Sequence, residues 1–418
     1  MEYTIGTLHQ GTAITLSAEE RRQHIHLIGA TGAGKSALLY SFMRSDFECS
    51  RGFALLDPHG DLAVSVADEA PRDRIMDTIY FDPLAEKTLS YNPLIYVSTL
   101  HRGTVASHIV SSFKHIWASS WGPRLEYILT NAIRLLLENK AVTLVGLPRL
   151  LTDTQFRNQL LRQCHDPFIA AFWKDEYATY SDRLRAEAIA PLQNKVGAFA
   201  NNPILRDIIG RPSTIDIPRI MNEGKVLLAN LSKRMGAEPS HLLGALLTTG
   251  FAQGAEGRAG IPEDERTDFS LYADEFQNFA TESFAHILSE ARKYRLNLVL
   301  AHQYLDQLPE DLKHAVLGNT GTVVVFRIGA YDAPLFAKHL GVPEHVLTTL
   351  PNYHAYASSE PTTSQEHAQG DVTPGMSSFR RLFSAGHRRI IVSMPNVVWR
   401  TNALLVRSTA GERFQSLA

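Results

Sequence analysis

One segment near the amino terminus constrains the fold more than any other. The apolar run HIHLI is followed directly by GATGAGKS, residues 29–36, and then by the helix-like run ALLYSFMRSDF. Strand, glycine-rich loop and helix in this order, with the spacing G-x-x-x-x-G-K-[ST], are typical of a phosphate-binding loop. The glycines let the backbone curl around phosphate oxygens at the positive end of a helix. The segment therefore predicts an α/β domain that binds a nucleoside triphosphate.

The same loop predicts roles for individual residues. Lys35 is expected to bridge the β- and γ-phosphates, and the hydroxyl of Ser36 is expected to ligate Mg²⁺. The predicted cofactors are accordingly ATP and Mg²⁺. The residues expected to contact the nucleotide are Gly29, Ala30, Thr31, Gly32, Ala33, Gly34, Lys35, Ser36 and Ala37.

Short apolar runs that alternate with helical patterns predict a mostly parallel sheet covered on both faces. The expected strands are His24–Ile28, Phe53–Asp57, Lys225–Asn230, Phe269–Asp274, Asn297–Ala301 and Thr322–Arg327. Between about residues 100 and 204 the pattern is helical only, which favours an inserted all-α subdomain over ordinary crossover helices. The helices expected there are Val105–Trp117, Arg124–Leu137, Thr154–Cys164, Pro167–Tyr177 and Asp182–Phe199.

These patterns divide the chain into five parts. Residues 1–99 and 205–357 are expected to form the two parts of one α/β nucleotide-binding domain, and residues 100–204 are expected to form the inserted all-α subdomain. Residues 358–376 are rich in Ser, Thr, Pro and Gly and are expected to be a linker. Residues 377–418 form a tail of unknown role with two short apolar runs, RRIIVSM and NALLVRS, that are candidate strands. The predicted fold class is α/β, a RecA-like P-loop NTPase with an inserted all-α subdomain.

Two expected strands end in aspartate, Asp57 and Asp274, but only Asp274 is followed by a glutamate, Glu275. An ATPase needs one carboxylate for the metal and another to polarise the attacking water. We therefore assign Asp274 to Mg²⁺ and Glu275 to the general base. For Asp57, in DPHGD, fixing of a loop and a plain turn remain equally good interpretations.

Two later residues are candidates for sensing the nucleotide. Gln303 follows an expected strand at its carboxyl end, where ligands meet such sheets, and can hydrogen-bond the γ-phosphate. Arg292 lies at the end of a helical run and can serve a neighbouring subunit as an arginine finger. From the residues alone, a solvated cation at a helix end is the slightly better reading of Arg292.

Absent motifs and composition narrow the function further. The chain has no Asn-Lys-x-Asp guanine reader and no Leu-Ser-Gly-Gly-Gln transporter signature, which leaves ATPases that perform mechanical work. The formal net charge of -2 excludes a generally basic coat, so any binding of nucleic acid must be local. Two distant cysteines argue against a disulfide framework and favour a reducing compartment. No segment approaches the roughly 20 consecutive apolar residues that a transmembrane helix needs.

The ordered motifs resemble those of the HerA–FtsK superfamily of hexameric DNA-pumping ATPases, and within it the TraG/TraD-type coupling ATPases of conjugation and type IV secretion. The resemblance covers roughly residues 5–357 and is carried by GATGAGKS, LLDPHGDL, YNPL, LYADEFQNF, SEARKYRLNLVLAHQYLDQL and LGNTGTVVVFRIGAYDA. It implies a homohexameric ring, ATP sites between subunits and DNA in the pore.

The resemblance also implies residue roles and partners. The spacing of Arg292 and Gln303 matches the family's trans arginine finger and glutamine sensor, which shifts our preference for Arg292 to the functional role. Arg327 lies in another recurrent motif and faces either nucleotide or an adjacent subunit, or is an ordinary strand-end arginine. Expected partners are DNA, further copies of the chain, and a relaxase or secretion-channel proteins. The expected location is the cytoplasm, with the inner membrane reached through partners.

Three alternatives remain open at this stage. One is a HerA-like helicase or translocase in DNA end processing or defence. Another is a monomeric helicase, because DEFQ resembles a DExQ box, although the residues after Arg327 are too few for a second motor domain. The third is a nucleotide-gated platform whose helical insertion docks a relaxase or effector. Trp117, Trp121, Arg124 and Trp173 could contact such a partner, but helical core is the preferred reading of them.

Overall fold

The computed structural model describes residues 2–7, 13–95, 97–118, 121–181, 183, 187, 189–190, 192, 196–197, 200–359 and 390–393. Its centre is an 11-stranded sheet with the order β2-β1-β11-β10-β9-β3-β8-β7-β4-β6-β5. The strands from β9 to β5 are parallel, and those from β10 to β2 are antiparallel to their neighbours. The prediction of a mostly parallel sheet is confirmed.

All six expected strands are present, with small shifts at their ends. They are β3 (Ile25–Ile28), β4 (Gly52–Asp57), β6 (Val226–Asn230), β7 (Phe269–Ala273), β8 (Leu296–His302) and β9 (Thr322–Val325). The structure adds the strands β1 (Glu2–Thr7), β2 (Ala13–Ser17), β5 (Thr78–Phe81) and β10 (His354–Ser359). These strands lie at or toward the edges of the sheet. Strands there need not be buried on both faces, so they can lack the continuous apolar run that marks a central strand in the sequence.

The carboxyl-terminal part of the chain contributes to the same sheet. β10 includes Ser358 and Ser359, so these two residues of the predicted linker belong to the sheet. The candidate strand in RRIIVSM is β11 (Ile390–Ser393), which lies between β1 and β10. The second candidate run, NALLVRS, and most of the predicted linker and tail lie outside the described residues.

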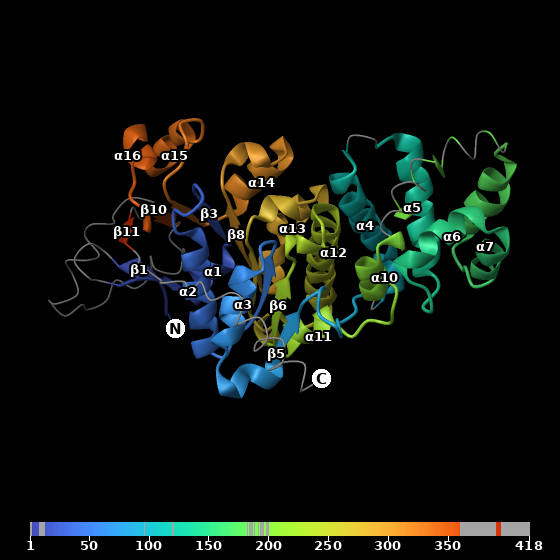
Figure 1. The fold of residues 1–418 in the computed structure, drawn as a ribbon, viewed down its shortest axis with the longest axis horizontal. Helices are drawn as coiled ribbons and strands as arrows, with labels where there is room; N and C mark the ends of the chain where they lie inside the picture. Colours follow the sequence, from blue (N-terminus) through green and yellow to red (C-terminus); the bar gives the residue numbers. More distant parts are fainter. Residues whose placement is uncertain are drawn as a thin grey trace.

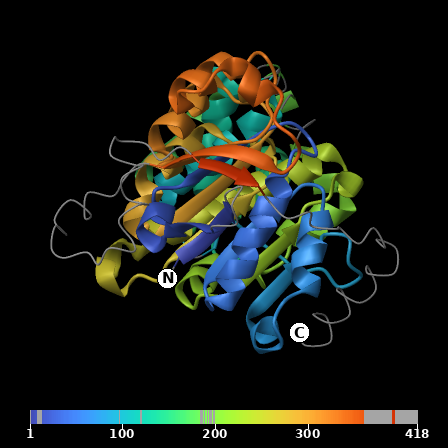
Figure 2. The same ribbon diagram turned by 90° about the vertical axis from the view of Figure 1, so that its left-hand side faces the viewer.

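Helices cover both faces of the sheet because successive side chains of each strand point to opposite faces. In β4, Phe53 and Leu55 join one core cluster, and Ala54 and Leu56 join another. The first face is covered by α2 (Lys35–Glu48) and α3 (Asp61–Asp68), as Figure 2 shows. The second face is covered mainly by α12 (Ala237–Glu256) and α13 (Glu282–Glu290). The remaining helices at the sheet are α1 (Ala18–Arg22), α14 (Glu310–Asn319), α15 (Ala333–Leu340) and α16 (Glu344–Thr348).

Between β5 and β6 the described residues form helices, turns and loops but no strand. This segment holds α4 (Arg102–Ile116), α5 (Pro123–Leu137), α6 (Leu147–Thr152), α7 (Thr154–Leu161), α8 (Pro167–Ala171), α10 (Pro203–Ile209) and α11 (Ile217–Asn222). Figure 1 shows α5, α6 and α7 at the end of the molecule opposite β10 and β11. Much of the expected helix Asp182–Phe199 lies outside the described residues.

The aromatic residues of this segment mainly form its core. Trp117 and Trp173 are buried, which agrees with the preferred reading of them as helical core. Trp121 is half-buried and donates a hydrogen bond to Glu126, whereas Arg124 is exposed. Within the described ranges, none of the helices is both long and apolar enough to cross a bilayer.

Candidate nucleotide-binding site

The glycine-rich loop connects β3 to α2 at the carboxyl edge of the parallel strands. Gly32 and Gly34 adopt φ values of +74° and +126°, which L-amino acids with side chains rarely adopt. A Cβ at Gly34 would also come within 2.9 Å of Cε1 of Phe326. The first-turn N–H groups of α2, from Lys35 to Ala37, have no intrahelical partner and are available to an anion. The loop thus has the backbone of a phosphate cradle.

Neighbouring strands hold this loop in place. The N–H of Gly29 donates to the carbonyl of His302 at 3.3 Å, and the N–H of Ala30 donates to the carbonyl of Arg327 at 2.7 Å. The side chain of Arg327 donates to the carbonyl of Leu350, which lies 3.4 Å away. Arg327 therefore supports the loop through its backbone, while its side chain contacts a carbonyl of its own chain.

Lys35 lies inside the loop and is only 5% exposed. Its Nζ donates to the carbonyls of Gly29 at 2.7 Å and Ala30 at 3.3 Å. Burial lowers the pKa of Lys35, and the nearby carboxylates of Glu275 and Asp274 oppose that shift. The ammonium group is thus placed beside the loop where phosphate oxygens would lie.

Ser36 and Asp274, the two predicted metal ligands, come from distant parts of the chain and meet here. The Ser36 hydroxyl donates to Oδ2 of Asp274 at 3.0 Å. Burial, and then the charges of Asp57 and Glu275, raise the pKa of Asp274 to about 6. A hydroxyl and a carboxylate are the hard oxygen ligands that Mg²⁺ prefers, and a buried group of acids favours a cation. These residues therefore fit Mg²⁺ bound together with a nucleotide.

Glu275 follows Asp274 in a left-handed conformation, with φ of +46°, which is uncommon for a side-chain-bearing residue and is frequent at functional sites. Its Oε1 accepts a hydrogen bond from Nε2 of Gln303 at 2.9 Å. Its Oε2 accepts one from Nε2 of Gln277 at 2.7 Å. The structure thus brings the predicted base and the predicted sensor into direct contact.

Asp57 fixes a loop beside the site. Its side chain is fully buried and accepts hydrogen bonds from the N–H groups of His59 and Ala63, both at 2.9 Å. Ala63 lies in the first turn of α3, so Asp57 holds the start of that helix. This favours loop fixing over a plain turn, and burial raises the pKa of this carboxyl.

Arg292 does not join the other predicted residues. It is exposed and lies in a 3-10 turn, Ala291–Tyr294, that precedes β8. Gln303 follows the other end of β8, so at about 3.3 Å per residue the two are roughly 20 Å apart along the strand. Within one chain, Arg292 therefore lies at the amino-terminal ends of the parallel strands, whereas the phosphate loop lies at their carboxyl ends.

Several residues that the sequence reasoning did not assign also shape the site. Gln277 lies two positions after Glu275 within LYADEFQNF, and its position in that motif is the only sequence signal for it. His26 and His302 form a buried pair beneath the loop, with their Nε2 atoms 2.6 Å apart. The N–H of Tyr353 donates to the carbonyl of Ala33 at 2.7 Å. No periodicity or spacing predicted these last contacts.

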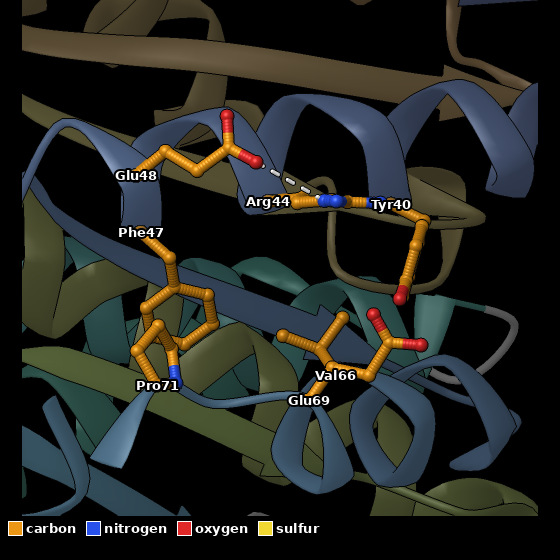
Figure 3. A pocket seen from close by; sticks show the side chains of 7 residues that line it. All are labelled: Tyr40, Arg44, Phe47, Glu48, Val66, Glu69 and Pro71. Atoms are coloured by element: carbon orange, nitrogen blue, oxygen red, sulfur yellow. Dashed lines mark hydrogen bonds and ion pairs between the residues drawn. The ribbon is translucent and has the colours of Figure 1, made fainter.

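A separate cavity of about 280 Å³ lies between α2 and α3 (Figure 3). Its polar groups pair with one another: Arg44 with Glu48 at 3.1 Å, and Tyr40 with Glu69. Its residues belong to the part of α2 that is distant from the loop and to α3 and the segment after it. Because its polar lining is already paired, we assign this cavity no ligand.

Comparison with known proteins gives a consistent result. Residues 8–367 match the family model described as the type IV secretion-system coupling protein DNA-binding domain. A search of curated protein sequences finds no match.

Similar folds occur among solved structures. The conjugative coupling protein TrwBdeltaN70 in its unbound form has a TM-score of 0.64 at 17% identity and covers 86% of each chain. TrwB in complex with ADP and Mg²⁺ has a TM-score of 0.65 at 16% identity, covering 96% of this chain and 92% of that one. VirB4 of Thermoanaerobacter pseudethanolicus has a TM-score of 0.57 at 12% identity, covering 95% and 97%.

Proposed function

The chain belongs to the family of type IV secretion-system coupling protein DNA-binding domains, and from that membership we propose that it is an ATP-hydrolysing motor that moves DNA. The observation that carries this proposal is the meeting, at one edge of the sheet, of the phosphate loop, the Ser36–Asp274 pair and the Glu275–Gln303 pair. The solved complex of TrwB with ADP and Mg²⁺ supports ATP and Mg²⁺ as the cofactors.

The residues divide the chemistry among themselves. The N–H groups of the loop and of α2 bind the phosphates, and Lys35 offsets their negative charge. Ser36 and Asp274 would hold Mg²⁺, which supplies further neutralisation of phosphate charge when bound. Glu275 orients the attacking water and accepts its proton. Gln303 contacts Glu275 directly and so links the γ-phosphate to the base.

We place Arg292 in the site of a neighbouring subunit. Arg292 is exposed and lies at the amino-terminal ends of the parallel strands, too far from the phosphate loop of its own chain to reach it. Both observations support a role between chains. A homohexameric ring with ATP between subunits and DNA in the pore is the assembly that this role favours. A small basic ring in each subunit is enough for such a pore, so the net charge of -2 is compatible with DNA.

The helical segment between β5 and β6 is the proposed docking region for a relaxase or a secretion-channel protein, which could link the motor to the inner membrane from the cytoplasm. A surface cavity of about 660 Å³ on α5 and α8 supports this, because Phe168 on its rim is 80% exposed. Our proposed domain division keeps residues 100–204 as the inserted subdomain and adds residues 358–359 and 390–393 to the motor domain, because they lie in β10 and β11 of its sheet.

Steady-state ATPase assays test the proposed function. We expect duplex DNA to stimulate hydrolysis, and the rate per subunit to rise with protein concentration as rings form. Glu275→Gln should reduce kcat by roughly two or more orders of magnitude while ATP still binds, as loss of a general base does. Full activity of that variant would refute the assignment of the base.

Mixed oligomers test Arg292. Because Arg292 is exposed, Arg292→Ala should leave the fold intact, with a stability change of about 0.5 kcal/mol or less. Mixing it with Glu275→Gln subunits should restore some turnover, because a mixed ring contains interfaces with an intact base and an intact arginine. Full activity of Arg292→Ala alone would show that another residue is the finger.

A further inference from the structure

The carboxylate of Glu275 is held on both sides by glutamine amides. Nε2 of Gln303 donates to Oε1 at 2.9 Å, and Nε2 of Gln277 donates to Oε2 at 2.7 Å. Glu275 is only 8% exposed, so few other approaches to its oxygens remain. A general base must offer an oxygen to the attacking water within hydrogen-bond distance. In this arrangement, an amide donor competes with the water at each oxygen.

The two glutamines are placed differently. Gln303 follows the carboxyl end of β8, beside the phosphate loop. Its amide can therefore give up its hydrogen bond to Glu275 and donate to a phosphate oxygen instead. Gln277 lies in the 3-10 turn Phe276–Asn278, directly after Glu275. Its Oε1 is buried and has no hydrogen-bond partner among the described residues, so its amide is anchored to Glu275 through Nε2. In the described residues, the side-chain hydrogen bond of Gln277 is therefore to Glu275.

The turn that carries Gln277 lies next to His115 of the inserted helices. The ring of His115, on α4, lies next to the backbone of Asn278 and Gln277: burial lowers the pKa of His115, and these two backbone groups oppose that shift. Asn278 in turn donates from Nδ2 to the carbonyl of Glu275 at 2.8 Å. A displacement of α4 would consequently move the turn and change the distance between the Gln277 amide and Glu275.

We propose that Gln277 is a positioning residue that restrains Glu275 in a resting geometry, and that His115 couples this restraint to α4. DNA engaged by the motor releases the restraint by moving α4 relative to the turn. The proposal rests on the proposed function, in which Glu275 is the base and DNA is the substrate. It adds a regulator of that base and a route from the helical segment to it.

The test uses the full chain with ATP and Mg²⁺, with and without linear duplex DNA. Gln277→Leu and Gln277→Met remove the amide donor and keep a similar volume. Each should raise the DNA-free kcat several-fold, leave the KM for ATP within about two-fold of the wild type, and reduce the stimulation by DNA. Gln163→Leu, which changes an exposed glutamine in the same way, is the matched control and should alter none of these values.

A second variant tests the coupling. His115→Ala should lower the ratio of DNA-stimulated to DNA-free kcat, whereas the control His314→Ala, at an exposed position on α14, should not. An unchanged ratio in His115→Ala would overturn the route through α4.

The outcomes separate this inference from the proposed function. If Glu275→Gln abolishes hydrolysis but both Gln277 variants, with wild-type melting temperatures, show a DNA-free kcat at or below the wild type, only the restraint is refuted. If one Gln277 variant fails to fold, the other decides. If Glu275→Gln keeps full activity, the proposed function itself has failed. A merely structural Gln277 would not raise kcat when it is replaced.

Discussion

Replacing Asp274 with asparagine should stabilise the nucleotide-free protein while it removes the activity. Asparagine keeps the shape of the side chain. Its Oδ1 can accept the hydrogen bond from the N–H of Glu275, now 3.0 Å long, and its amide can donate to the Ser36 hydroxyl. The main change is therefore the loss of a buried negative charge that lies near Asp57 and Glu275.

The magnitude follows from the pKa of Asp274. Burial and the neighbouring acids raise that pKa from an ordinary 3.8 to about 6. Below pH 3.8 both the folded and the unfolded state carry the proton, so the charge costs no stability. As pH rises through about 6, the folded state must ionise a group that the unfolded state ionised earlier, and stability is lost. A shift of about two units corresponds to roughly 3 kcal/mol at pH 7 and above.

Urea unfolding at several pH values, with EDTA and without nucleotide, measures this effect. We expect Asp274→Asn to unfold like the wild type near pH 4 and to be more stable by roughly 1–3 kcal/mol at pH 7.5. Asp73→Asn, at an exposed position, is the matched control and should show no such pH-dependent gain. A variant that is less stable at pH 7.5, or a difference that does not change with pH, would refute the reasoning. Mg²⁺ with nucleotide should stabilise only the wild type.

Other predictions concern the backbone of the loop and the support of the turn before β8. Gly34→Ala should abolish nucleotide binding in a fluorescent-nucleotide titration. At φ of +126° a side chain is strained, and the new Cβ would also press on Phe326, so the loop would be distorted. The control is Gly103→Ala, because a Cβ at Gly103 meets nothing within 4 Å. Arg258→Ala should lower stability by about 3 kcal/mol or more in urea unfolding, since it leaves several buried acceptors unpaired. The fully buried Arg258 donates to the carbonyls of Met221, Thr267 and Tyr294 and to Oδ1 of Asn222. A loss below 1 kcal/mol would show that water replaces these bonds.

Much of the site was predictable because its signals are local. The phosphate loop is a run of consecutive residues between a strand and a helix, and its glycines are required by backbone geometry rather than by distant contacts. The apolar runs of β3, β4, β6, β7, β8 and β9 are buried on both faces, and that alone marks them in a sequence. The edge strand β5 was missed because its partly exposed side chains permit a mixed composition, and β10, which pairs with β9 and β11, was missed because its short run HAYASS is not continuously apolar.

Contacts between distant residues were decided by the order of the strands. Ser36 meets Asp274, and Gln303 meets Glu275, because β3 pairs with β8 and β8 pairs with β7. The identities of these residues predicted their chemistry, but their spacing along the chain contained no information on which oxygen each would contact. The hydrogen bond from Gln277 to Glu275 and the position of His115 beside the same turn could not be predicted for the same reason.

The sequence by itself thus predicted the fold class, the phosphate loop and the acids that we propose to serve it, because each depends on residue types in a local pattern. Only the tertiary structure decided that Asp57 fixes a loop, that Arg292 lies at the end of β8 away from the phosphate loop, and that two amides contact Glu275, the proposed base. These facts depend on how strands far apart in the sequence are paired, and the pairing is a property of the whole packed chain.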